Sequence, residues 1–116
     1  MAVPAPAALP EPPYYAVIFS SNRVEGGEGY DETAARMLEL ARKQPGFLGI
    51  DSTGGEGELG ITVSYWRDEE AILAWRDHAE HLVAQADGRE RWYERFAVHV
   101  ARVERAYGFV RPAAGS

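Results

Sequence analysis

Two strand-like segments joined by a glycine-rich turn occupy the middle of this chain and constrain its fold more than any other feature. Residues 47–53 and 59–66 are rich in β-branched and aromatic residues and alternate in character. The turn between them, Gly54-Gly55-Glu56-Gly57, is typical of a β-hairpin. Helix-like segments flank the hairpin on both sides, and further strand-like segments lie outside them. The order β-α-β-β-α-β predicts a ferredoxin-like α+β fold.

The two helices are predicted from apolar residues that recur at helical spacing. The first opens at Tyr30 or Asp31, and Pro45-Gly46 ends it. The second follows Asp68, a favourable N-cap residue, and Gly88 is expected to stop it. One face of the second helix is apolar and should pack on the sheet; its residues are Ile72, Trp75, Ala79, Leu82, Val83 and Ala86.

The outer strands are expected at residues 14–21 and 94–109. Phe96, Val98 and Val100 alternate in the last strand, and a shift of pattern at residues 101–103 suggests a β-bulge there. In the second strand, simple alternation assigns one face to Phe47, Gly49 and Asp51 and the other face to Leu48, Ile50 and Ser52.

A single folded domain is expected at residues 14–110. Residues 1–13 contain five prolines and no basic residue, so they are interpreted as a disordered or extended arm and not as a signal peptide. Residues 111–116 are interpreted as a flexible tail.

Charge and composition exclude several classes of function. The net charge is −6, and the basic residues alternate with acidic ones, which argues against nucleic acid as a partner. The absence of cysteine excludes disulfides, thiolate metal sites and cysteine nucleophiles. No apolar run approaches the ~20 residues of a membrane helix, so no membrane partner is expected. A cytoplasmic location without a metal or cofactor fits these features.

The predicted sheet has apolar or aromatic residues on both faces of its third and fourth strands, although two helices can cover only one face. An uncovered apolar face promotes association. We therefore expect an obligate homodimer in which two sheets enclose a shared interior about a two-fold axis.

Several segments together resemble the antibiotic biosynthesis monooxygenase family. They are PGFLGIDS at 45–52, GITVSYWRDEEAILAW at 60–75, AQADGRERWYERF at 84–96 and VARVERAYGF at 100–109. The resemblance extends from Tyr14 to Phe109 and implies the dimeric α+β barrel. Members of this family include cofactor-independent oxygenases of polycyclic aromatic ketones and quinols, haem-degrading oxygenases, and many uncharacterised proteins, which this sequence resembles most.

The resemblance also implies a comparison with the haem-degrading members. These use an Asn on the first strand, a Trp in the second helix and, further along that helix, a His that binds iron. Trp75 matches the Trp, but Gln85 stands where the His is expected, and Asn22 lies just beyond the first-strand position. Haem degradation by that machinery is therefore not expected.

The candidate site is placed around the second helix, where aromatic residues and histidines concentrate. Trp66, Trp75 and Tyr65 are expected to hold an aromatic substrate, and core packing is the alternative for Trp75. Because strand neighbours alternate, one of Tyr65 and Trp66 should face the barrel interior and the other the helix–sheet core, and Trp66 is the one expected in the pocket. His81 is the candidate general base, with His78 beside it; both are alternatively surface histidines. A metal site is not expected, because two histidines at this spacing lack a third ligand.

Tyr93 either closes the mouth of the pocket, with Arg89 or Arg91 binding an anionic group, or belongs with Trp92 to a packed loop that anchors the last strand. His99 is expected to be exposed or at an interface. With the resemblance, these residues predict a cofactor-independent monooxygenase for a small aromatic, phenolic or quinol substrate. The alternatives are a non-catalytic dimeric module that binds an aromatic or haem-like molecule, and a haem oxygenase with altered ligation.

Overall fold

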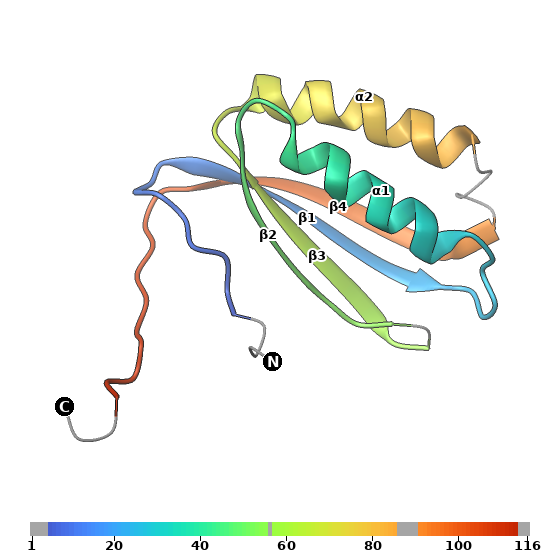
Figure 1. Ribbon diagram of the computed structural model, residues 1–116, viewed down its shortest axis with the longest axis horizontal. Coiled ribbons are helices and arrows are strands. Elements are labelled where there is room, and N and C mark those ends of the chain that lie inside the picture. Colours follow the sequence, from blue (N-terminus) through green and yellow to red (C-terminus); the bar gives the residue numbers. More distant parts are fainter. Residues whose placement is uncertain (1–4, 56, 86–90, 114–116) are drawn as a thin grey trace.

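One antiparallel sheet with two helices on a single face forms the domain (Figure 1). The computed structural model describes residues 5–55, 57–85 and 91–113. The strands are β1 (Tyr14–Arg23), β2 (Phe47–Thr53), β3 (Leu59–Trp66) and β4 (Tyr93–Val103), and the helices are α1 (Tyr30–Arg42) and α2 (Glu69–Gln85). The strand order is β2-β3-β1-β4. The predicted ferredoxin-like α+β fold is confirmed.

The core lies between the helices and the sheet. Trp66 at the end of β3 is fully buried and packs with Ala41 of α1 and Ile72 of α2. Further partly buried side chains surround this cluster; they are Tyr15, Val17, Phe47, Ala71 and Trp75. One aromatic residue at a strand end therefore joins the sheet to both helices. Among the described residues, no helix is long and apolar enough to cross a membrane.

The start of α2 is held by its cap and by the segment before β2. The carboxylate of Asp68 accepts a hydrogen bond from the backbone N–H of Ala71 at 2.9 Å, as expected of an N-cap. The backbone N–H of Arg67 donates to the carbonyl of Gly46 at 2.8 Å. Gly46 has φ +87°, and a Cβ there would lie 2.7 Å from that of Ala71, so this close approach requires glycine.

Strand β4 is shorter than the sequence pattern indicated. It ends at Val103, which pairs with Tyr14 at the start of β1. Pro13 precedes Tyr14 and has no N–H to offer a further residue of β4, so pairing cannot continue to residue 109. The bulge expected at residues 101–103 is also absent there; the register of β1 with β4 shifts instead at Asn22 and Arg23.

Strand β2 departs from simple alternation at its first residues. Phe47 pairs with Trp66, and Gly49 pairs with Tyr65, the residue before Trp66, so the register shifts around Leu48. Phe47 consequently lies on the helix side of the sheet and not on the face shared by Gly49 and Asp51. The assignment of these three residues to one face was wrong, because an extra residue in the strand reverses the alternation.

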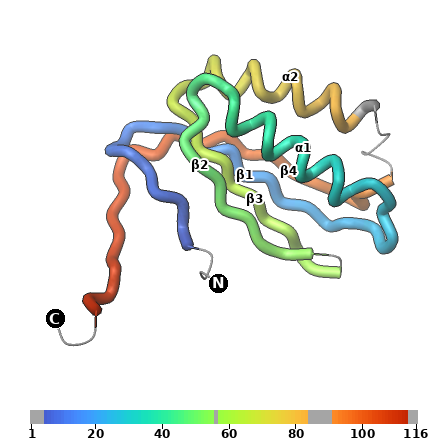
Figure 2. Tube along the Cα trace, viewed as in Figure 1, coloured from blue at the N-terminus to red at the C-terminus, as the bar shows by residue number. Residues whose placement is uncertain are grey.

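The face of the sheet without helices is partly covered by residues 5–13. The backbone N–H of Ala7 donates to Asp51 at 2.8 Å. A Cβ on Gly49 would lie 3.0 Å from the Cβ of Ala7 and 3.2 Å from Leu9, so this arm packs closely on β2. The C-terminal residues after Val103 behave differently: they lead away from both the sheet and the helices (Figures 1 and 2).

Candidate functional site

Trp66 and Trp75 lie together, as the predicted site required, but they fill the space between them. Their rings stack with centroids 6.2 Å apart, and Phe47 meets Trp66 edge-on at 5.3 Å. The indole N–H of Trp66 donates to the hydroxyl of Ser64 at 2.9 Å, which satisfies the only polar group of this buried side chain. Trp66 is therefore part of the core, and Trp75 is half-buried beside it.

Tyr65 lies on the opposite face of the sheet, where no helix covers it. Its hydroxyl donates to Asp51 at 2.9 Å, and its ring meets Tyr14 edge-on at 6.0 Å. Burial, the hydrogen bond to Asp51 and the charge of that carboxylate raise the pKa of Tyr65 to about 12. Asp51 thus joins β3 to the N-terminal arm, and Tyr65 does not face Trp66 or Trp75.

The three histidines are exposed. On α2, His78 borders the apolar stripe of Ile72, Trp75 and Ala79, whereas His81 falls on the opposite side of the helix, given about 100° of rotation per residue. His99 lies on the face of the sheet away from the helices, because it pairs with Ile18. Within the described residues, no three His, Cys, Asp or Glu side chains gather in a way that would hold a metal ion.

Tyr93 belongs to a second aromatic group at the far end of the sheet. Its ring lies 5.5 Å from Phe19, 6.1 Å from Tyr30 and 5.6 Å from Phe96, and Phe19 and Phe96 stack on each other at 5.4 Å. We call these four residues the aromatic cluster. Burial raises the pKa of Tyr93 well above its usual range, and Tyr30 adds to the rise.

Trp92 locks the loop between β1 and α1 beside this cluster. Its indole N–H donates to the carbonyl of Glu28 at 2.8 Å, and its carbonyl accepts from the N–H of Val24 at 2.9 Å. The ring is buried and packs against Gly27, where a Cβ would lie 3.1 Å from it. These contacts agree with the role considered for Trp92, in which a packed loop anchors the last strand. Arg89, and Gly88 at the expected end of the second helix, lie outside the described residues.

A cavity of about 280 Å³ opens between α1 and the sheet, directly beside the aromatic cluster. Phe19 and Tyr30 form its aromatic wall. Its polar lining includes the hydroxyls of Ser52 and Thr62, which are hydrogen-bonded to each other at 2.8 Å, and the buried Ser21. Arg23 also lines the cavity, and its guanidinium lies 4.0 Å above the ring of Tyr30. Asp31 lines it as well, so the cavity joins an aromatic wall to hydroxyls, one basic side chain and one acidic side chain.

An apolar surface continues from the cluster along β4. Phe96, Val98 and Val100 pair with Ser21, Phe19 and Val17, which places them on the helix side of the sheet. They are nevertheless 39%, 50% and 52% exposed, because the helices do not cover this edge strand. We call these three residues the β4 stripe. Phe19 joins the β4 stripe to the cavity, so a planar molecule that covers the stripe could direct its polar groups toward the hydroxyls.

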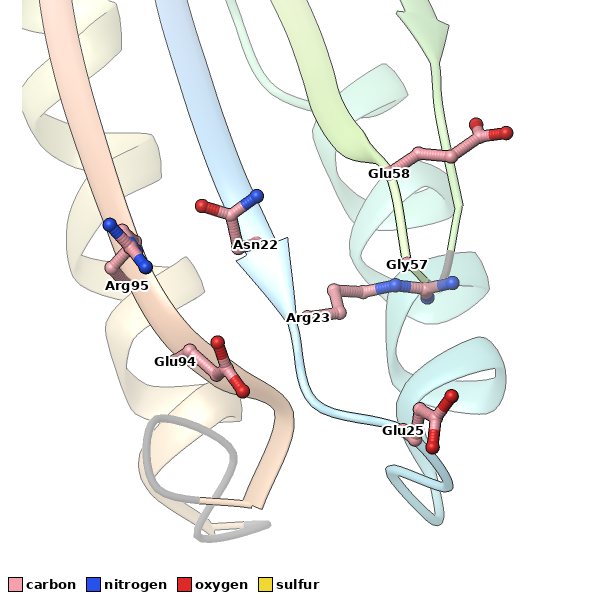
Figure 3. Close-up of a pocket in the computed structure, with 7 residues that line it drawn as sticks. All are labelled: Asn22, Arg23, Glu25, Gly57, Glu58, Glu94 and Arg95. Atoms are coloured by element: carbon pink, nitrogen blue, oxygen red, sulfur yellow. The ribbon is translucent and has the colours of Figure 1, made fainter.

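A larger depression, of about 560 Å³, lies at the same end of the sheet and is lined by charged residues (Figure 3). Its carboxylates come from Glu25, Glu58 and Glu94, on three separate segments, and they do not converge on one point in Figure 3. Arg23 lies between these carboxylates, whereas Arg95 lies on β4 beside Glu94. Such a mixed and open surface is typical of solvated charges.

The model of the antibiotic biosynthesis monooxygenase family matches residues 13–87. The chain belongs to this family. The family resemblance noted from the sequence is therefore confirmed, and the four-stranded sheet with two helices agrees with the fold of its structural neighbours.

Individual relatives include characterised and uncharacterised proteins. The uncharacterised protein YqjZ of Bacillus subtilis is 57% identical over 96 residues, covering 83% of this chain and 84% of its own. Jasmonate monooxygenase ABM of Pyricularia oryzae is 37% identical over 43 residues, or 37% of this chain and 20% of its own.

Solved structures of low identity share the fold. Rv0793 of Mycobacterium tuberculosis superposes with a TM-score of 0.65 at 22% identity, covering 81% of this chain and 99% of its own. A mutant of SnoaB, a cofactor-independent oxygenase from Streptomyces nogalater, superposes with a TM-score of 0.61 at 11% identity, covering 90% of this chain and 100% of its own.

The aromatic cluster was not recognised from the sequence, apart from Tyr93. Phe19 and Phe96 are 77 positions apart, and only the pairing of β1 with β4 brings them together. A signal was available: Phe96, Val98 and Val100 alternate, which puts all three on one face. Which face this was depends on the register with β1, and the register is a long-range property of the fold.

Proposed function

We propose that the protein is a cofactor-independent monooxygenase for a small aromatic, phenolic or quinol substrate that binds on the aromatic cluster and the β4 stripe. The observation that supports this most strongly is the stacked pair Phe19 and Phe96, which continues into an exposed apolar stripe on one side and a hydroxyl-lined cavity on the other. Aromatic faces bind planar rings by stacking and apolar burial. The cavity size suits a substrate of one or two rings.

In such a reaction the substrate itself supplies the electrons. A base removes a proton from a phenol or an activated C–H group, and the resulting anion transfers an electron to dioxygen. In the overall change, a CH2 group flanked by aromatic carbon becomes a carbonyl, one oxygen atom enters the product, and the other leaves as water. The protein must therefore bind the ring, stabilise the anion and accept a proton.

His81 stays a prediction as the general base, although it is exposed on the side of α2 opposite the apolar stripe and is not among the residues that line the cavity. His78 borders that stripe and is its natural comparison. If His81 is the base, His81→Ala lowers kcat at least ~100-fold at neutral pH, whereas His78→Ala changes it little. Equal turnover by wild type and His81→Ala would remove His81 from the mechanism.

The proposed binding site is tested by oxygen uptake with a panel of quinols and anthrone-like ketones, with incorporation of one labelled oxygen atom measured by mass spectrometry. Phe19→Ala should raise KM at least tenfold, because it removes the ring that joins the β4 stripe to the cavity. Thr62→Val, nearly equal in shape, should raise KM with less risk to folding. Leu73→Ala, on an exposed part of α2, is the matched control. Unchanged KM in both site variants would exclude this site.

A second candidate function is a binding module without catalysis. The observation in its favour is that none of the three histidines is among the residues that line the cavity, so no imidazole base faces a ligand bound there. Calorimetry would detect aromatic ligands that bind without oxygen uptake. Binding without turnover across the panel would support the module and contradict the monooxygenase.

We also propose that the protein associates with itself through the face of the sheet opposite the helices. That face includes Ile18 and Val63, which pair with each other, and the exposed Ala97 and Ala101 of β4. The N-terminal arm lies on β2, and Tyr14 and Ala16 at the start of β1 are buried, so the remainder of β1 and β4 is left for a partner. We call this β1 and β4 side the open face.

A further inference from the structure

The chain after β4 presents large apolar side chains that its own copy leaves uncovered. Tyr107, Phe109 and Val110 are 100%, 82% and 89% exposed. Residues 104–113 have no helix or strand, and we call residues 104–110 the C-terminal arm. Large apolar side chains exposed close together are typical of an interaction site.

The N-terminal arm of the same molecule, in contrast, is bound to its own sheet. Ala7 donates a hydrogen bond to Asp51, and Leu9 packs against Gly49, so that arm is attached to its own sheet. Among the described residues, the C-terminal arm has no such attachment. It leaves the sheet at Val103 and runs away from the helix layer (Figures 1 and 2). A surface that receives it must therefore belong to another molecule.

The open face of a second copy fits this arm in chemistry. Ala97 and Ala101 have short side chains, so another chain can approach the β4 backbone closely there. Ile18 and Val63 beside them supply apolar surface for Tyr107 and Phe109. His99 lies between the two alanines and is the polar residue of this region, so the arm and the open face are two largely apolar surfaces carried by every copy.

The arm is also long enough. Seven extended residues span up to about 23 Å, whereas the three spacings across four strands amount to about 14 Å. After the ~10 Å that separates two packed sheets, an arm that starts at the sheet edge still has enough length to cross the β1 and β4 side of a partner, which is narrower than the full sheet. Each copy carries one arm and one open face. In a dimer with a two-fold axis, each arm binds the open face of the other copy, so no arm or face is left for a third copy.

We propose that the C-terminal arm of each copy crosses onto the open face of a second copy, with Tyr107 and Phe109 covering Ile18, Ala97 and Ala101. This rests on the self-association proposed above and adds the segment that performs it. The arms make the dimer an exchange of C-terminal segments and not only a contact of two sheets.

The first experiment compares the masses of three proteins by light scattering over a range of concentrations. The wild type should be a dimer. A chain ending at Val103, and the double variant Tyr107→Ser/Phe109→Ser, should dissociate at concentrations at least tenfold higher. The two substitutions change only exposed side chains of a single copy, so they do not threaten its folding. A monomeric wild type would overturn both the self-association and the arm. A dimer as tight in the variants as in the wild type would overturn the arm alone.

The second experiment uses the absence of cysteine in the natural chain, which makes any introduced thiol unique. A chain with Ala97→Cys and a size-tagged chain with Tyr107→Cys are mixed and treated with a short bismaleimide. A cross-linked product containing both chains is expected. Leu73→Cys, on the exposed side of α2, replaces Ala97→Cys as the control and should give none. Equal yields with both partners, or no product with either, would contradict the proposal.

Discussion

Asp51 shows how one side chain can join parts of the molecule that are distant in sequence. One carboxylate oxygen accepts a hydrogen bond from the N–H of Ala7 at 2.8 Å, and the other accepts from the hydroxyl of Tyr65 at 2.9 Å. The N-terminal arm, β2 and β3 therefore meet at a single acid. Charge-assisted hydrogen bonds of this kind are stronger than neutral ones, which makes Asp51 a focal point for stability on this face.

The raised pKa of Tyr65 leads to a prediction about alkaline pH. Its pKa is about 12 in the folded protein, compared with 10.0 for the ordinary side chain, so the unfolded chain loses this proton first as the pH rises. The contribution to stability is complete below pH 10 and is lost between pH 10 and about pH 12. Urea unfolding of the wild type, followed by circular dichroism, should show this decline.

Tyr65→Phe should be less stable at pH 8 by about 1 kcal/mol, because the hydrogen bond to Asp51 is lost. Its stability should also fall less steeply above pH 10 than that of the wild type. Tyr107→Phe keeps the ring that the proposed dimer uses and removes only a hydroxyl that is exposed in a single copy, so it is the control and should match the wild type in both respects. Identical alkaline slopes for Tyr65→Phe and the wild type would show that Tyr65 does not cause the decline.

At the scale of elements, α2 is held at its start by a capping side chain and along its length by Ile72 and Trp75. Helix N-termini carry unpaired N–H groups, and the Asp68 carboxylate pairs with one of them. Asp68→Ala should therefore lower the free energy of unfolding by about 1 kcal/mol. Asp77→Ala, at an exposed position within the helix, is the comparison and should change it by less than half as much. Chemical denaturation of the two variants side by side provides the measurement.

The elements themselves show where sequence patterns suffice. The bounds of β2 and β3 agree with the segments 47–53 and 59–66, since a glycine-rich turn and a Trp-Arg-Asp boundary limit them locally. The end of β4 could not be predicted from its own residues, because it depends on where β1 offers its last partner, at Tyr14. The same holds for Phe47, whose face is set by the register shift near Leu48.

Some features of the candidate site likewise follow from local sequence patterns, whereas others depend on how distant segments pack together. Helical spacing and strand alternation placed Trp66 near Trp75, and the rings do stack. Spacing could not show that the two rings fill their own space, since this depends on how closely α2 approaches β3. The aromatic cluster forms only when β1 pairs with β4 in the observed register. The sequence pattern therefore indicated only Tyr93 among its four members as a site residue.

For the whole molecule, the proposed dimer predicts that thermal stability depends on concentration. Association stabilises the folded state by mass action, so the Tm of the wild type should rise as the protein concentration is raised about a hundredfold. The variant Tyr107→Ser/Phe109→Ser should show a weaker rise within the same range. Calorimetric scans at three concentrations would measure this. A Tm independent of concentration in the wild type would indicate a protein that unfolds as a monomer.

The two buried tryptophans give this molecule an optical property that follows from their positions. Trp66 lies where β1 begins to pair with β3, and Trp92 lies beside the loop after β1 ends, so the two indoles sit at opposite ends of the sheet. Both are shielded from water when the chain is folded, and both would shift their fluorescence emission to longer wavelength on exposure. Replacing either one by Phe, together with Trp75, would leave a single tryptophan, at one end of the sheet. The fluorescence of these two variants during unfolding would show whether the two ends of the sheet open together or one after the other.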